Sequence, residues 1–273
     1  MGVINETRKA VSDARNFGWR FLSGRWAAKG SRDVIALPVR HYGHVFVRPA
    51  NTDIETLRDV LAGRSYDFSF PAQLGDRVNS FYHSVLSAGR KPVIIDAGAN
   101  IGAASLWFRR LFPEAHIVAI EPDADNGRVL RENIGGLPNC TILNAAIGST
   151  SGFAAVRDGE GDDSGWAKQT ERATSGVPIV TMAEAIATVD DGTALIVKID
   201  IEGFESDLFQ ANLDWLDDVR VVIIEPHDWM KPGEGTSFSF QRAMAAHSFE
   251  LFIRGENLIY VRLQPDRKNA SSR

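Results

Sequence analysis

The chain has 273 residues, of which 44% are hydrophobic and 24% are charged, with 24 glycines and 11 prolines. This composition is typical of a globular protein, and it excludes a disordered, a collagen-like or a coiled-coil chain. The net charge of −5 argues against a general nucleic-acid-binding protein, because such proteins carry an excess of lysine and arginine.

The cysteine content and the apolar runs indicate the compartment. Cys140 is the single cysteine, so no disulfide can form within the chain, which is typical of a reducing compartment. The apolar runs are much shorter than the roughly 18 residues that a membrane span needs, and the N-terminus lacks the apolar core of a secretion signal. We expect a cytoplasmic protein without a transmembrane segment.

Residues 1–32 form a basic segment that is rich in aromatic side chains. The segment has seven basic and two acidic residues, whereas the rest of the chain is acidic. A basic aromatic helix can lie on an anionic membrane, which would make the protein peripheral to it. It can also pack on the protein itself or on a second subunit, which would make a homo-oligomer. We expect packing on protein, because aromatic residues at this density need an apolar partner surface; they are Phe17, Trp19, Phe21 and Trp26.

Residues 33–90 predict a small β and helical unit. Two short strands flank a turn at 42–44, and a capping box of Thr52 and Glu55 predicts a helix that ends at Gly63. A second helix is predicted over 74–88, and the sequence 89–92 then interrupts the pattern. We therefore expect residues 1–90 to form an N-terminal helical and β cap.

From residue 91 onward, apolar strands alternate with helices. The alternation predicts an α/β fold with a mostly parallel sheet and helices on both faces, closed by an antiparallel C-terminal hairpin. This core domain covers 91–262, a polar tail covers 263–273, and the polar segment 150–180 predicts an insertion over one end of the sheet. The predicted strands are 93–96, 117–121, 140–144, 194–200, 219–225, 250–254 and 258–262, and the predicted helices are 103–111, 125–133, 204–213 and 238–246.

A glycine turn after the strand at 93–96 indicates a cofactor site. Gly98 permits a sharp turn, Gly102 permits close packing of the next helix, and the start of that helix offers free N–H groups. The G-x-G-x-x-G pattern of dinucleotide enzymes is absent, which argues against an NAD-dependent oxidoreductase. Asp96 suits the ammonium of a methionine moiety, and Glu121, at the end of the next strand, suits two ribose hydroxyls. This pair points to S-adenosylmethionine.

Four motifs resemble the FkbM family of S-adenosylmethionine-dependent methyltransferases. They are DAGANIG at 96–102, IEP at 120–122, NAAIG at 144–148 and KIDIEGFE at 198–205, and the resemblance covers roughly 45–262. It implies a class I methyltransferase fold, which is Rossmann-like, and O-methylation of a hydroxyl on a saccharide, a glycoconjugate or another natural product. The cofactor-binding residues expected on these motifs are Asp96, Gly98, Asn100, Gly102, Glu121, Pro122, Ala145 and Asp200.

A hydroxyl acceptor must lose its proton, so the reaction calls for a base near the methyl group. The candidate catalytic residues are His227, Asp200 and Glu202, which follow neighbouring strands. His227 is favoured because the ordinary histidine pKa suits a base at neutral pH, and Asp200 is the alternative. Asp200, Glu202 and Asp228 can also coordinate a divalent metal, but we expect no metal.

Three aromatic side chains are candidates for substrate binding. Trp229 begins a loop over 229–237, which we predict to be a lid. Thr236 or Ser237 is expected to cap the helix that follows. Trp166 lies in the insertion, and Tyr66 lies upstream in the region of resemblance. Buried lysines are usually paired, so we expect Lys198 to form a structural ion pair with an acid.

The function expected is methyl transfer to a small-molecule or glycan hydroxyl. Two alternatives stay open at this point. One is a methyltransferase that acts on nitrogen or on protein, and the other is a catalytically silent binding module with a cofactor fold.

Overall fold

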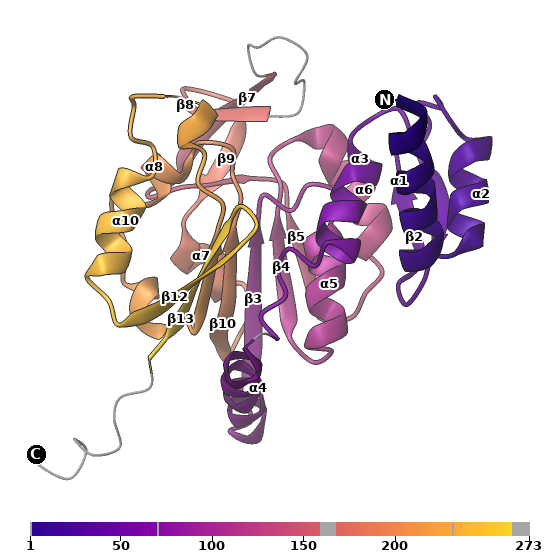
Figure 1. Cartoon of the computed structure of the whole chain (residues 1–273). Helices are drawn as coiled ribbons and strands as arrows, with labels where there is room; N and C mark the ends of the chain where they lie inside the picture. The colour runs from indigo at the N-terminus through magenta and orange to yellow at the C-terminus, as the bar shows by residue number, and fades with distance from the viewer. Residues whose placement is uncertain (1, 70, 159–167, 231, 264–273) are drawn as a thin grey trace, which may run out of the picture.

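A seven-stranded sheet lies at the centre of the computed structural model, which describes residues 2–69, 71–158, 168–230 and 232–263 (Figure 1). The strand order is β12-β13-β11-β10-β3-β4-β5. Among these strands, β13 alone runs in the direction opposite to the other six. The predicted mostly parallel sheet with an antiparallel hairpin is therefore confirmed. Its strands are β3 (Lys91–Ala97), β4 (His116–Ile120), β5 (Cys140–Leu143), β10 (Gly192–Ile199), β11 (Val221–Ile224), β12 (Phe249–Arg254) and β13 (Asn257–Arg262).

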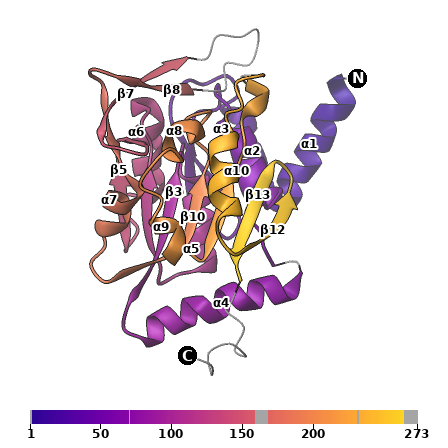
Figure 2. The same ribbon diagram turned by 90° about the vertical axis from the view of Figure 1, so that its left-hand side faces the viewer.

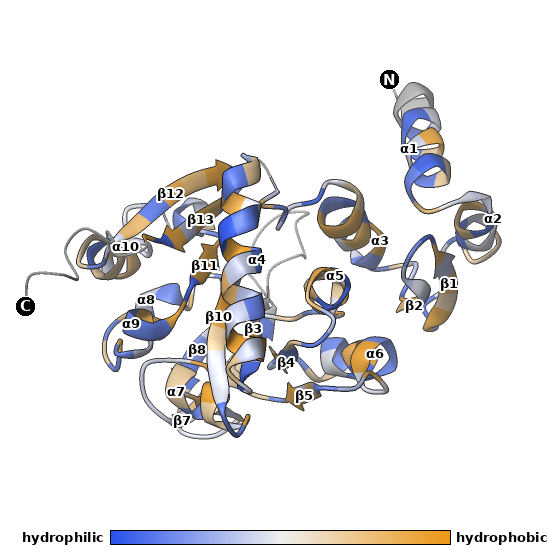
Figure 3. Ribbon diagram, turned by 90° about the horizontal axis from the view of Figure 1, so that it is seen from below, coloured by the Kyte–Doolittle hydropathy of each residue, from blue (hydrophilic) through white to orange (hydrophobic). Residues whose placement is uncertain are grey.

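Helices cover both faces of this sheet, as predicted. The central strands are rich in valine and isoleucine that are buried, and helices lie on both sides of the sheet (Figure 3). Two hydrophobic clusters result, one on each face. One face carries α5 (Ala103–Leu111) and α6 (Ala124–Ile134), and the other carries α7 (Met182–Ala187), α8 (Glu205–Leu208), α9 (Trp215–Asp218) and α10 (Phe238–Ala245).

The segment predicted as an insertion forms a second sheet. Its four strands pair in the order β6-β9-β7-β8 and lie toward the upper end of the main sheet (Figures 1 and 2). Ala154, Ile179 and Phe204 make a small apolar cluster beneath it, which explains how a polar segment becomes ordered. The strands are β6 (Ala146–Ile147), β7 (Gly152–Asp158), β8 (Lys168–Ala173) and β9 (Val177–Val180).

The N-terminal region packs on the body of the protein. Phe17 and Phe21 are buried in the cluster that also holds residues of α5 and α6, whereas Trp19 and Trp26 are 76% and 61% exposed. Asp13, fully buried, accepts hydrogen bonds from two arginines of neighbouring elements. The elements are α1 (Gly2–Asn16), α2 (Trp19–Ala27), β1 (Ile35–Val39), β2 (Gly43–Val47), α3 (Asp53–Leu57), the π-helical turn η1 (Arg58–Ala62) and α4 (Ala72–Ser87).

Three local predictions are wrong. Thr52 begins α3 without a side-chain cap, because the carboxylate of Glu55 pairs with Arg58 at 2.8 Å instead of turning back to the helix start. The helix predicted over 204–213 ends at Leu208, four residues before the left-handed backbone of Asn212. At the start of α10, neither predicted cap forms: Ser237 makes no side-chain cap, and the hydroxyl of Thr236 donates to Asp228.

The two ends of the main sheet are occupied differently. Helix α4 runs across the end where the strands begin (Figure 2). The end where the parallel strands finish carries the loops that follow β3, β4, β10 and β11, where open α/β sheets bind their ligands. In the part of the chain that the structure describes, no helix is long and apolar enough to cross a membrane.

Candidate active site

The glycine turn after β3 brings two loops into close contact. Gly98 has a left-handed backbone (φ +75°), and a Cβ at this position would lie 1.8 Å from the backbone oxygen of Asp200. The N–H groups of Gly98 and Ala99 donate to the carbonyl of Ile120 at the end of β4. Only glycine fits this position, because any side chain would push the loop after β10 away.

Glu121 lies at the floor of the same turn. Its carboxylate accepts hydrogen bonds from the backbone N–H of Asn100 (2.8 Å) and of Asp123 (2.9 Å). Burial nevertheless raises the pKa of Glu121 to about 7, because those two hydrogen bonds compensate the lost hydration only in part. A ligand that donates further hydrogen bonds to this carboxylate would stabilise its ionised form.

A cavity opens beside this turn. Six of the eight predicted cofactor-binding residues line it, namely Gly98, Asn100, Glu121, Pro122, Ala145 and Asp200. The sequence analysis did not predict other lining residues, which include Asn126, Thr170, Ile201 and Phe204. Glu202, predicted only as a catalytic residue, also lines this cavity. Thr170 and Phe204 come from β8 and the start of α8, and nothing in their local sequence marks them as neighbours of the glycine turn.

Asp96 and Gly102 do not line the cavity. Asp96 is fully buried, accepts a hydrogen bond from Ser105 (2.7 Å) and lies 3.2 Å from the ammonium of Lys198. Gly102 begins α5 with a left-handed backbone, and a Cβ there would lie 2.8 Å from Leu130 of α6. Both residues therefore lie behind the turn, and the direct contact expected between Asp96 and the cofactor stays a prediction.

Lys198 connects the two strand ends. Its ammonium donates to the carbonyl of Gly98 (2.7 Å) and lies 3.5 Å from the carboxylate of Asp200. Burial by itself lowers the pKa of Lys198. The neighbouring Tyr66, Asp96 and Asp200 raise it by more than burial lowers it, so the pKa lies above its ordinary value and the lysine stays charged. The predicted structural ion pair is present, and it holds the glycine turn to the loop after β10.

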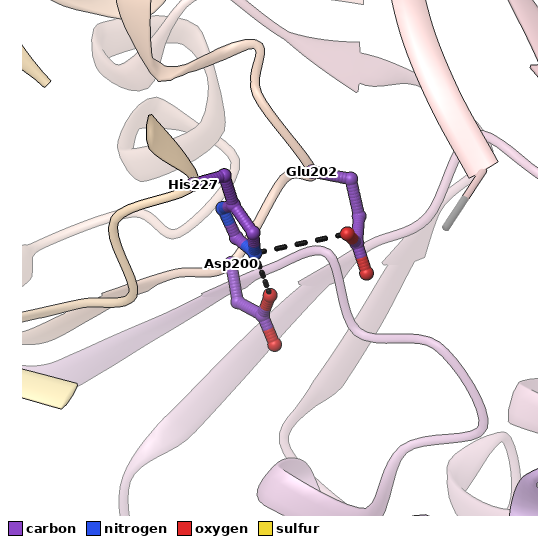
Figure 4. A group of neighbouring side chains, drawn as sticks. All are labelled: Asp200, Glu202 and His227. Atoms are coloured by element: carbon purple, nitrogen blue, oxygen red, sulfur yellow. Dashed lines mark ion pairs between the residues drawn. The ribbon is translucent and has the colours of Figure 1, made fainter. Parts of the chain in front are cut away.

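His227 follows β11 and lies among several carboxylates, of which Figure 4 draws Asp200 and Glu202. Its Nδ1–H donates to Glu205, 22 residues away in the chain, at 2.9 Å, and both side chains are almost fully buried. Its Nε2 faces Asp200 and Glu202, each at 3.7 Å. Burial lowers the pKa of His227, but the hydrogen bond and charge of Glu205, with Asp200 and Glu202, raise it to about 9. The ring is thus an imidazolium at neutral pH.

Glu202 occupies the most unusual position in this group. Its backbone is left-handed (φ +53°), a conformation that is uncommon for non-glycine residues and that Asn100 in the glycine turn also adopts. Burial and the charge of Asp200 raise the pKa of Glu202 to about 7. A carboxylate with a near-neutral pKa is suited to exchanging protons at physiological pH.

The same group has the donor set of a cation site. One ligand atom from each of Asp200, Glu202 and His227 lies within 4.8 Å of the others. Carboxylate oxygens and imidazole nitrogen are the ligand types that divalent cations accept. Asp228, a third acid considered in the sequence analysis, accepts hydrogen bonds from Thr236 and Ser237 instead.

The predicted substrate-binding aromatic residues are placed differently from one another. Tyr66 is buried and lines a second, larger cavity that also touches Asn100, Asp200 and Glu202. Trp229 is 68% exposed, and its ring centre lies 6.3 Å from that of His227. Trp166 lies outside the described residues.

Sequence comparison assigns the family. The methyltransferase FkbM domain matches residues 96–251, which is more than half of the chain. The chain belongs to the FkbM methyltransferase family. The predicted class I methyltransferase fold is confirmed, because the seven-stranded sheet and the family match agree with it.

Relatives of this FkbM methyltransferase include a hexuronic acid methyltransferase and a 2-O-methyltransferase. The hexuronic acid methyltransferase AglP of Haloferax volcanii is 25% identical over 175 residues, which cover 64% of this chain and 72% of that protein. The 2-O-methyltransferase NoeI of Sinorhizobium fredii is 26% identical over 155 residues, which cover 50% of this chain and 64% of that protein, just under two thirds. Among solved structures, a precorrin-6y C5,15-methyltransferase from Geobacter metallireducens is 12% identical, with a TM-score of 0.36, over 68% of this chain and 86% of that chain.

Proposed function

We propose that this FkbM methyltransferase transfers a methyl group from S-adenosylmethionine to a hydroxyl of a saccharide, a glycoconjugate or a related natural product. One observation carries the proposal. The cavity at the glycine turn and the larger second cavity meet at Asn100, Asp200 and Glu202. A methyl donor in the first and an acceptor in the second would therefore react beside two carboxylates. The names of both curated relatives, one of which acts on hexuronic acid, support an oxygen acceptor on a sugar.

The residues at the glycine turn suit S-adenosylmethionine. Glu121 is a buried carboxylate whose pKa is raised, so the two hydroxyls of a ribose would supply the hydrogen bonds that it lacks. Asp200 lines the same cavity, where its carboxylate could accept a hydrogen bond from an ammonium group. The chemistry that the bound cofactor supplies is an electrophilic methyl group, which forms a C–O bond with the acceptor while the electron pair of the broken C–S bond stays on sulfur.

Asp96 and Lys198 act through position. Because Lys198 donates to the Gly98 carbonyl and faces both Asp96 and Asp200, it fixes the glycine turn and the loop after β10 relative to each other. Fixed geometry matters for a displacement in line, since alignment supplies a large part of the rate enhancement.

Glu202 is the group we assign as the base. The sequence analysis favoured His227, but His227 is held as an imidazolium by Glu205 and its neighbours, and so it has no free lone pair at neutral pH. Glu202 lines both cavities and has a pKa of about 7, so it can take the acceptor proton as the C–O bond forms. The positive His227 then lowers the cost of placing charge on Glu202 and Asp200.

A binding titration and a transfer assay test the proposal. Glu121→Gln removes the charge that accepts the ribose hydrogen bonds, so its affinity for S-adenosylhomocysteine in calorimetry should fall about ten- to hundredfold. Glu132→Gln, on the exposed face of α6, is the matched control and should bind as the wild type does. The wild type should also move radiolabelled methyl to hydroxyls of a glycoside panel. Binding without any transfer would favour a silent binding module, and transfer to nitrogen or protein would refute the O-methylation proposal.

A further inference from the structure

The second cavity has the size and the place of an acceptor pocket. It measures about 800 Å³, which is in the range of small-molecule sites. One wall comes from α3 and η1, including Glu55, Thr56 and Asp59, and the opposite wall comes from the turn between β12 and β13. Elements that are about 200 residues apart in the chain thus enclose the space next to the reacting carboxylates. If the glycine-turn cavity takes the methyl donor, this space remains for the acceptor.

The lining of this cavity is rich in carboxyl groups, although burial and the charge of Asp200 raise the pKa of Glu202 to about 7 and that of Glu225 to about 8. Six carboxylates face one arginine among the described lining residues; the acids are Glu55, Asp59, Asp200, Glu202, Glu225 and Glu256, and the arginine is Arg254. Arg254 already donates to the backbone oxygen of Arg64 (2.6 Å) and lies 3.9 Å from the carboxylate of Asp67. An anionic acceptor would therefore find no free positive group in the described lining.

Part of this charge is compensated from behind, and part is not. Lys198 and His227 lie close to Asp200 and Glu202, and Arg58 pairs with Glu55. In the described part of the chain, Asp59 and Glu256 form no ion pair. Among the described residues, the outer part of the cavity, formed by η1 and the turn after β12, thus has acids without a paired base, and a cationic ligand would neutralise them.

Asn257 provides an independent observation. The residue lines the cavity and is 5% exposed, and its buried Oδ1 has no hydrogen-bond partner among the described residues. An unpartnered buried amide oxygen costs free energy and accepts only from an N–H or O–H group. A ligand with donors at this point would satisfy it, whereas a carboxylate would repel it. The pattern of acceptors around this end of the cavity calls for a ligand rich in donors.

We infer, on the basis of the proposed methyl transfer, that the second cavity binds an acceptor that carries a protonated amine near the reacting hydroxyl, such as an amino sugar. The acids of η1 and of the turn after β12 attract the ammonium, and Asn257 accepts a hydrogen bond from it or from a neighbouring hydroxyl. A uronic acid would bring a like charge into this cavity. This chain would then differ in acceptor class from its Haloferax relative, whose name specifies hexuronic acid.

Matched glycosides test this inference. The wild type is assayed with amino, neutral and uronic pyranosides of the same configurations, at one ionic strength and with a chelator present. We expect kcat/KM to decrease from amino to neutral to uronic glycosides. Glu256→Gln should lower the preference for amino over uronic glycosides about five- to tenfold, because one facing charge is lost. The control variant Glu132→Gln, far from the cavity, should leave the preference unchanged.

Three results would overturn the inference. They are a preference for uronic glycosides, an unchanged preference in Glu256→Gln, and activity that needs an added divalent cation, since the acids would then hold a metal. If no glycoside is methylated, calorimetry with an amino glycoside and S-adenosylhomocysteine still decides. Binding that Glu256→Gln weakens would support the cavity assignment although the proposed function fails, and no binding would refute the assignment itself.

Discussion

The identity of the base can be decided by replacing Glu202 with glutamine. This substitution keeps the size and the hydrogen-bonding shape of the side chain but removes its ability to take a proton. Because Glu202 lines both cavities and its carboxylate lies 3.7 Å from His227 without accepting a hydrogen bond from any described residue, we expect a folded protein with near-normal affinity for S-adenosylhomocysteine. Loss of a general base typically lowers turnover about 10²- to 10⁴-fold.

The pKa of Glu202 sets the pH at which the wild-type rate changes. A base acts when it is deprotonated, so a pKa of about 7 predicts that kcat/KM rises with pH through about 7 and is flat above it. Two pH units below the midpoint, about 1% of the base is ionised, and the rate at pH 5 should be about a hundredth of the plateau. His227→Gln removes the neighbouring positive charge, and should therefore move the midpoint to higher pH.

Steady-state methyl transfer measured from pH 5 to 9 separates the two candidates. In Glu202→Gln the residual rate should lose the rise near pH 7. If the rise persists in Glu202→Gln and disappears in His227→Gln, the histidine is the base and the electrostatic argument for an imidazolium is wrong. Calorimetry with S-adenosylhomocysteine at each pH controls for changes in cofactor binding.

Three further substitutions test the packing around the site. Lys198→Met leaves the buried carboxylate of Asp96 without a countercharge, so urea denaturation should show a loss of about 3–5 kcal/mol in the free energy of unfolding, and a loss below about 1 kcal/mol would contradict the ion pair. Gly98→Ala forces a Cβ to 1.8 Å from a facing backbone oxygen, so S-adenosylhomocysteine affinity should fall at least about tenfold in calorimetry; unchanged affinity would refute the close approach. Phe21→Ala should destabilise by about 3–5 kcal/mol, whereas Trp19→Ala, on the exposed side of the same helix, should change stability by less than about 0.5 kcal/mol.

The sequence by itself determined the parts of this protein that depend on local pattern. Runs of valine and isoleucine between helices predicted the parallel sheet, because strands buried on both faces are mostly apolar and contain polar residues only where these are paired, as Asp96 and Lys198 are. The glycines after β3 and the acid after β4 predicted the turn and its carboxylate, since parallel strands end at one edge of a sheet. Most of the predicted cofactor residues line that cavity for the same reason.

Contacts between distant segments were decided by the tertiary structure alone. The sequence predicts Asp96 as a ligand-facing acid, whereas the sheet register sets it opposite Lys198, whose ammonium lies 3.2 Å from its buried carboxylate. The sequence predicts His227 as a neutral base. In the structure, the short helix α8 brings Glu205 to the Nδ1 of His227, and this contact raises the pKa of the histidine. The acidic second cavity exists because η1 and the turn after β12 face each other across the end of the sheet. Charge and pKa depend on distances of a few ångströms in space, and the spacing of residues along a chain does not contain those distances.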